Sequence, residues 1–179
     1  YAARGNVIRH NIFHHVGGFG KASSWVPVSD GKVKFEYPHF TWGIYLDAPE
    51  TGVHVYGNVL YSVPVCGMFN HSGKDNTWEN NVIVDCPAFR ASVWDRDPLF
   101  KTSWAKLNKA REEWNYAKYL EKYPELARYD EDELRQNTMF NCRFIRNIVY
   151  YTPEGGKWMR ERNSSAWEQG QLVWSYRGH

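Results

Sequence analysis

Apolar and polar residues alternate over several short segments of the chain, and this alternation recurs around four asparagines. In segments 5–13, 53–61, 76–84 and 141–149, an asparagine is followed by two apolar residues and preceded by apolar residues at alternate positions. Alternation with a period of two is typical of β-strands. The aligned residues are Asn11, Asn58, Asn81 and Asn147. The pattern predicts a repeated unit of short strands.

The spacing of the asparagines predicts how the units stack. Asn81 follows Asn58 by 23 residues, which suits one coil of a solenoid, and the longer gaps indicate coils that carry insertions. Asparagines stacked at a corner can hydrogen-bond to each other and tolerate left-handed backbone conformations. The repeated asparagine therefore has a structural explanation.

A second set of strands lies between these units. Segment 43–47 aligns with 67–71 at a spacing of 24 residues, and 67–71 aligns with 88–92 at a spacing of 21. Alternate residues of a strand point to opposite faces. The inward positions are Ile44, Leu46, Met68, Phe89 and Ala91. The outward positions, expected to form columns, are Tyr45, Asp47, Phe69, His71, Arg90 and Ser92.

Two sets of strands in phase at about 23 residues favour a mainly β fold, a right-handed parallel β-helix, over an antiparallel β-sandwich. We expect residues 1–179 to form a single β-helix domain. Its first residues already belong to a repeat strand with no polar cap, so we expect a piece of a longer solenoid. Residues 167–176 could add another strand.

Two insertions interrupt the coils. Residues 17–42 form a loop rich in glycine, serine and aromatic residues. Residues 98–136 are predicted to be helical, with a break at Pro124 and a short helical turn at 129–134. Such excursions either border a binding cleft or cover the coil surface, and the sequence leaves both possibilities open.

Composition excludes several classes of protein. A net charge of +2 argues against a nucleic-acid partner, and no apolar stretch approaches the roughly 18 residues of a membrane span. The 9 Trp, 12 Tyr and 9 Phe exclude disorder. The three cysteines, Cys66, Cys86 and Cys142, form no CxxC pair and imply no disulfide framework.

No metal or other cofactor is expected. His10, His14 and His15 resemble a metal cluster, but strand alternation sends His14 and His15 to opposite faces. The chain also lacks a run of aspartates of the kind that binds calcium.

Several segments carry a family resemblance. They are 43–47, 52–61, 70–76 and 79–87, with Leu46-Asp47 and the run His71 to Asn81 the most specific, and 123–127 in the helical insertion. They resemble right-handed β-helix proteins of bacterial polysaccharide-degrading systems, closest to relatives of glycoside hydrolase family 141 in the pectate-lyase-like superfamily. The resemblance covers about residues 5–150. It implies a secreted or periplasmic bacterial protein of carbohydrate metabolism.

The chain departs from this family at two positions. Ala48 and Ser92 stand where the family often carries acids. This weakens a direct transfer of catalytic roles.

Candidate catalytic residues follow from the chemistry of glycosidic bonds. Hydrolysis typically uses two carboxyl groups that flank the scissile bond. Asp47 is the first candidate, with His71 one rung away as its partner, and Asp95 is the best second carboxylate. Expected substrate contacts are Tyr45, Arg90, Trp42, Trp94 and Lys74; Trp78 could also stack on a sugar.

We therefore expect a carbohydrate-active enzyme, a glycoside hydrolase that acts on a plant or other complex polysaccharide. The alternatives are a polysaccharide lyase acting on a uronate-containing glycan and a non-catalytic glycan-binding module. A lyase would abstract the proton α to a uronate carboxylate. The expected partners are a polysaccharide or oligosaccharide and the remainder of the parent β-helix chain, with no nucleic acid and no membrane insertion.

Overall fold

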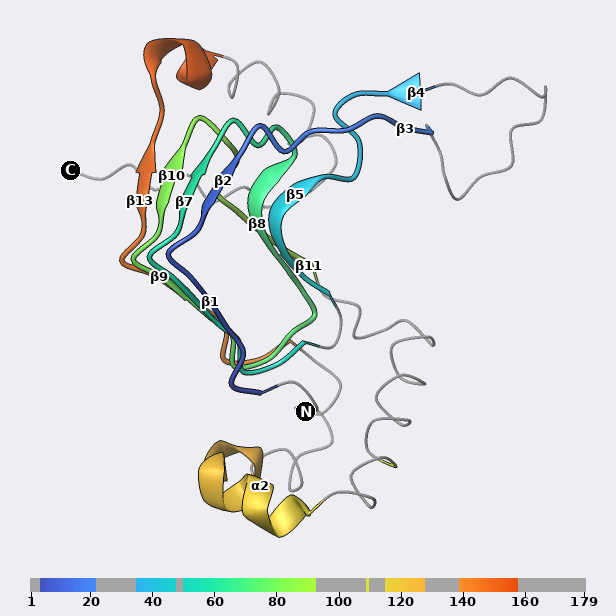
Figure 1. The fold of residues 1–179 in the computed structure, drawn as a ribbon, viewed down its shortest axis with the longest axis vertical. Helices are drawn as coiled ribbons and strands as arrows, with labels where there is room; N and C mark the ends of the chain where they lie inside the picture. Colours follow the sequence, from blue (N-terminus) through green and yellow to red (C-terminus); the bar gives the residue numbers. More distant parts are fainter. Residues whose placement is uncertain are drawn as a thin grey trace.

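A computed structural model describes residues 4–21, 35–47, 50–92, 109, 115–127 and 139–157. This part of the chain is mainly β, with parallel sheets and few helices (Figure 1). Among the described residues, no helix has the length and apolar character needed to cross a bilayer. Residues 93–100, which include the candidate site residues Trp94 and Asp95, lie outside the described residues.

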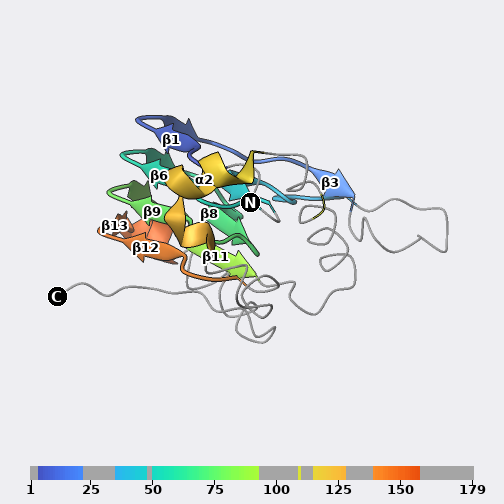
Figure 2. The same ribbon diagram turned by 90° about the horizontal axis from the view of Figure 1, so that it is seen from below.

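Strands that hold equivalent places in successive repeats lie side by side in three parallel sheets. The first sheet has the order β1 (Val7–Arg9), β6 (His54–Tyr56), β9 (Thr77–Glu79), β12 (Arg143–Ile145). The second has the order β2 (Ile12–His14), β7 (Val59–Tyr61), β10 (Val82–Val84), β13 (Ile148–Tyr150). The third has the order β5 (Trp42–Leu46), β8 (Cys66–His71), β11 (Phe89–Ser92). Each repeat thus contributes one layer, and Figure 2 shows β1, β6, β9 and β12 one beneath another.

The strand register confirms the alignment of the second set of strands. Tyr45 of β5 pairs with Phe69 of β8, a spacing of 24 residues, and Phe69 pairs with Arg90 of β11, a spacing of 21. Side chains at paired positions stand on the same face in neighbouring strands. The predicted outward columns therefore form.

The predicted asparagine ladder also forms. The Asn58 backbone N–H and side-chain Nδ2 both donate to Asn81 Oδ1 at 3.0 Å, and the same pair of bonds joins Asn81 to Asn147 Oδ1 at 2.9 Å. Asn11 donates to Asn58 in the same way at 3.1 Å. The residue before each asparagine has a positive φ: His10 (55°), Gly57 (64°), Asn80 (52°) and Arg146 (54°). The asparagine side chains thus stabilise a tight corner in each repeat, where the chain passes from the first sheet to the second.

The core lies between the three sheets. Its buried members are Ile44, Leu46, Val53, Val55, Leu60, Val63, Met68, Trp78, Ile83, Cys86 and Ala88. Phe89 packs against it, but Ala91, predicted to be inside, is exposed; within the described part of the chain its strand β11 pairs with β8 alone. Trp78 is fully buried and contacts Phe89, so it cannot stack on a sugar.

The two insertions are described in part. Residues 20–21 and 35–36 form a short antiparallel hairpin, β3 (Gly20–Lys21) and β4 (Phe35–Glu36). In the second insertion, α2 (Tyr116–Lys122) is followed by the 3-10 turn η2 (Pro124–Leu126), as expected from Pro124. The turn predicted at 129–134 lies outside the described residues.

Candidate active site

The outer face of the third sheet carries a column of aromatic rings. The rings of Tyr45 and Phe69 stack with centroids 4.9 Å apart, and Trp42 stacks on Phe69 at 5.1 Å. The Arg90 guanidinium lies over Phe69 at 5.3 Å. His71 continues the column, 5.4 Å from the Phe69 ring. Although they point outward, Phe69 and His71 are each only 5% exposed, because neighbouring layers cover them.

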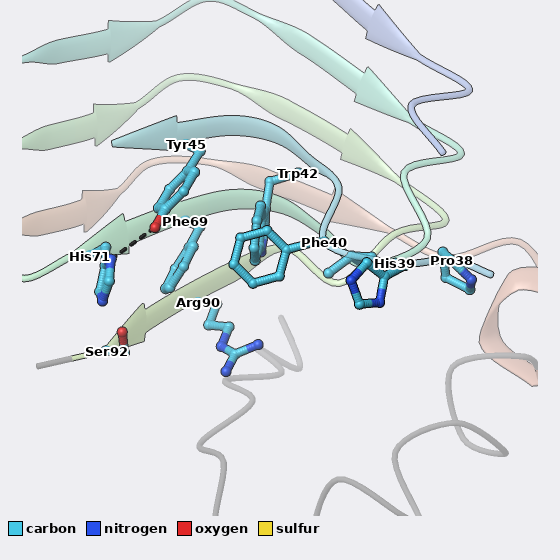
Figure 3. Close-up of a pocket in the computed structure, with 10 residues that line it drawn as sticks. Pro38, His39, Phe40, Trp42, Tyr45, Phe69, His71, Arg90 and Ser92 are labelled. Atoms are coloured by element: carbon cyan, nitrogen blue, oxygen red, sulfur yellow. Dashed lines mark hydrogen bonds between the residues drawn. The ribbon is translucent and has the colours of Figure 1, made fainter. Parts of the chain in front are cut away.

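This column forms one wall of an open pocket of about 310 Å³ (Figure 3). The loop before β5 extends this wall past Trp42, so the first insertion borders the pocket rather than only covering the coil surface. The lining residues are Pro38, His39, Phe40, Trp42, Tyr45, Val65, Phe69, His71, Arg90 and Ser92. Sequence reasoning noted the aromatic loop but did not select Pro38, His39 and Phe40; their proximity depends on how the loop folds back.

A polar group lies at one end of the column, where Tyr45 and His71 line the pocket and Asp47 bonds to both from beside it. The Tyr45 hydroxyl donates to Asp47 Oδ1 at 2.9 Å, and His71 Nδ1 lies 2.9 Å from the same oxygen. The Tyr45 oxygen and His71 Nδ1 are also 2.8 Å apart. Asp47 is 68% exposed at its side chain, so water reaches this carboxylate. The structure thus brings together three residues that the sequence selected.

The Tyr45 phenol has a strongly raised pKa. Its desolvation is the largest cause, followed by its hydrogen bond to Asp47 and the charge of that carboxylate. The phenol therefore stays protonated at neutral pH and serves as a hydrogen-bond donor. It holds the Asp47 oxygen in a fixed position beside His71.

Two further side chains give the pocket its polar character. Arg90 lines it with its guanidinium over Phe69, and Ser92 lies at the register position of His71. Trp42 Nε1 is buried and has no hydrogen-bond partner among the described residues. The pocket therefore offers a cation and a hydroxyl beside aromatic rings, whereas the indole N–H of Trp42 is closed off from it.

Lys74, predicted to contact substrate, is instead fully buried away from this pocket. It sits where Thr51 and Phe140 form backbone bridges on either side. Burial lowers the pKa of its ammonium group to about 7. Lys74 thus belongs to the interior. Trp94 and Asp95 lie outside the described residues.

The prediction that His14 and His15 face apart is wrong. Their Nδ1 atoms are 2.9 Å apart, and both rings contact Tyr61. His15 has a φ of 52°, which ends the strand and breaks the alternation on which the prediction rested. In the described part of the chain, no group of three or more His, Cys, Asp or Glu residues is placed to hold a metal ion.

Comparisons with known proteins give no family. The chain matches no protein-family model, and no curated protein or solved structure shows a significant match to it.

Proposed function

We propose that this chain is a right-handed parallel β-helix and that the pocket beside Asp47, which we name the Asp47 pocket, binds and hydrolyses a complex polysaccharide. The fold proposal is supported by the three parallel sheets, each of which receives its strands from successive layers. An outward column on such a sheet is a suitable place for a site, because the core below it holds the strands in register.

The observation that carries the function is the carboxylate of Asp47, oriented by Tyr45 and His71, which both line the pocket. Hydrolysis needs one carboxyl group to protonate the leaving oxygen and a second to activate water or attack the anomeric carbon. Asp47 is open to water and hydrogen-bonded, which suits the base or nucleophile. His71 positions it.

We propose Asp95, the second carboxylate predicted from the sequence, as the acid. It lies outside the described residues. Arg90, Ser92 and Trp42, which line the pocket, would hold the sugar ring.

A lyase is the second candidate, because His71 and Arg90 line the same pocket and none of its described lining residues is a carboxylate. In that reaction Arg90 would neutralise a uronate carboxylate, and His71 would take the α-proton. The electron pair would form the new C=C bond as the C–O bond breaks. The protonated Tyr45 hydroxyl would supply the proton to the leaving oxygen.

One experiment separates these functions. The protein, Asp47→Asn and the control Glu121→Gln on exposed helix α2 are incubated with a panel of polysaccharides. New reducing ends without ultraviolet absorbance, lost by at least about 100-fold in Asp47→Asn, support the hydrolase. Absorbance of an unsaturated product supports the lyase. Binding without cleavage indicates a glycan-binding module, and full activity in Asp47→Asn contradicts the role of Asp47.

A further inference from the structure

Exposed aromatic rings gather on the two arms of the first insertion. Residues 17–21 and 35–40, which we name the aromatic hairpin, include Phe19 (78% exposed), Phe35 (66%), Tyr37 (58%) and Phe40 (60%). Folding normally removes such large apolar surfaces from water, and an exposed cluster marks a binding site. The described part of the insertion is therefore a candidate binding surface.

The rings of the hairpin run into the candidate active site. Phe19 contacts Tyr37 with ring centroids 4.9 Å apart. Further along, His39 contacts Phe40 at 6.0 Å, and Phe40 meets Trp42 edge to face at 4.5 Å. Figure 3 shows Pro38, His39 and Phe40 extending the line of Tyr45 and Trp42 beyond the column. Pro38, His39 and Phe40 thus line the candidate active site, while Tyr37 of the same hairpin lines a second pocket, of about 420 Å³, with Ser62 and Pro64.

The hairpin rings are held in place by the opposite arm. His39 N–H donates to Gly18 O at 3.0 Å. A Cβ on Gly20 would lie 1.8 Å from His39 Cδ2, and one on Gly17 would lie 2.6 Å from the Tyr37 hydroxyl oxygen. These rings therefore rest directly on glycine backbone, where no larger residue fits. Such a surface needs little ordering when a ligand binds.

We propose that the aromatic hairpin binds the continuation of a polysaccharide chain whose reacting sugar lies in the Asp47 pocket. This proposal rests on the proposed function and names its substrate class, the internal part of a polymer rather than a short oligosaccharide. Sugars present C–H faces that pack on aromatic rings and hydroxyl groups that bond at their edges. Tyr37 and His39 place polar atoms between the phenylalanines, which suits such a ligand.

Affinity electrophoresis tests this proposal. The protein is run in native gels that contain xylan, polygalacturonate, β-glucan or arabinan, and retardation gives an apparent Kd. We expect Phe19→Ala and Tyr37→Ala each to weaken binding to the retarding polymer by about three- to tenfold, and to leave binding of its trisaccharide unchanged. The matched control is Tyr150→Ala, which removes an equally exposed tyrosine (56%) from β13. Circular dichroism verifies folding.

The outcomes distinguish this proposal from the proposed function. If Phe19→Ala and Tyr37→Ala are retarded as strongly as the wild-type protein, the hairpin proposal is overturned. The hydrolase proposal still stands in that case if Asp47→Asn loses cleavage. Weakened polymer binding without any cleavage supports the hairpin proposal and contradicts the hydrolase. A wild-type protein retarded by no polymer overturns the hairpin proposal. A dimer in size-exclusion chromatography that Phe19→Ala converts to a monomer would also overturn it and assign the rings to self-association.

Discussion

Tyr45 and His71 lie on neighbouring strands of one sheet, and the Tyr45 hydroxyl oxygen is 2.8 Å from His71 Nδ1. They are diagonal neighbours, because the residue directly opposite Tyr45 is Phe69. Only a long side chain spans a diagonal pair on a sheet. The phenol thus connects the aromatic column to the polar end of the pocket.

Replacing Tyr45 by phenylalanine separates these two roles. Tyr45→Phe keeps the ring on Phe69 but removes the hydrogen bonds to Asp47 and His71. A hydrogen bond to a charged group contributes about 1.5–3 kcal/mol, so we expect cleavage of the active polymer to fall about 10- to 100-fold. The free energy of unfolding should fall by about 1 kcal/mol at most, because water can replace the lost bond at the exposed Asp47 carboxylate. Initial rates and urea denaturation measure both effects.

The control for this variant is Tyr56→Phe, which removes a hydroxyl that Arg9 Nη1 contacts at 2.9 Å on a different sheet. Equal rates for Tyr45→Phe and Tyr56→Phe would show that the Tyr45 hydroxyl does not position Asp47.

The asparagine ladder should contribute unequally along its length. Asn58 is fully buried, and its side chain bonds to Ile8 O, Tyr56 O and Asn81. We expect Asn58→Ala to lower the free energy of unfolding by about 2–3 kcal/mol, because buried backbone groups lose their partners. Asn11→Ala, at an exposed position, should cost about 1 kcal/mol or less. Urea unfolding followed by circular dichroism gives both values, and equal losses would refute this ranking.

Burial of Lys74 predicts a dependence of stability on pH. Its pKa in the folded state, about 7, lies below the usual value of a lysine. Below about pH 7 both states carry the proton, and the folded state bears the full cost of the buried charge. As the pH rises further, the folded state releases the proton while the unfolded state keeps it, so stability rises by up to about 1.4 kcal/mol per unit.

The variant Lys74→Met tests that dependence. It should gain stability over the wild type at about pH 6 and lose that advantage by about pH 9. Urea unfolding at both pH values measures the difference. A difference between the two proteins that does not change with pH would mean that Lys74 keeps its usual pKa in the folded state.

The corner conformations give a pair of opposite predictions. Gly57 has a φ of 64°, and a Cβ there would lie 2.7 Å from His10 Cδ2. Gly57→Ala should therefore reduce stability by about 1–2 kcal/mol. Ser62 has a φ of 54°, so Ser62→Gly should raise stability by about 0.5 kcal/mol. Thermal unfolding measures the stability of both variants. If both are stabilised or both are destabilised, backbone strain does not explain the changes.

Sequence spacing was enough to place the outward columns, since a strand period of two and a fixed offset determine which residues stack. It therefore brought Tyr45, Asp47 and His71 to one place. It could not show that Tyr45 bonds to both partners, because that depends on side-chain length across a diagonal. It also missed the burial of Lys74, which lies between strands β8 and β9 and forms isolated backbone bridges, where no run of alternating residues gives a direction.

The histidine pair shows a second kind of failure. Alternation applies only while the backbone stays extended, and His15 adopts a left-handed conformation that sequence does not signal as glycine or asparagine would. Arg146 at the corner before Asn147 is a similar case, whereas Gly57 and Asn80 are residues that favour positive φ.

The strict register of the third sheet has a practical consequence for engineering. Each outward position of β8 has fixed neighbours about 4.8 Å away on β5 and β11, while Met68 and Asn70, next to Phe69 in sequence, are buried. Outward-facing positions of this sheet can therefore be substituted with little effect on the core beneath them. A new binding surface could be designed on this sheet by choosing the side chains at paired positions of neighbouring strands.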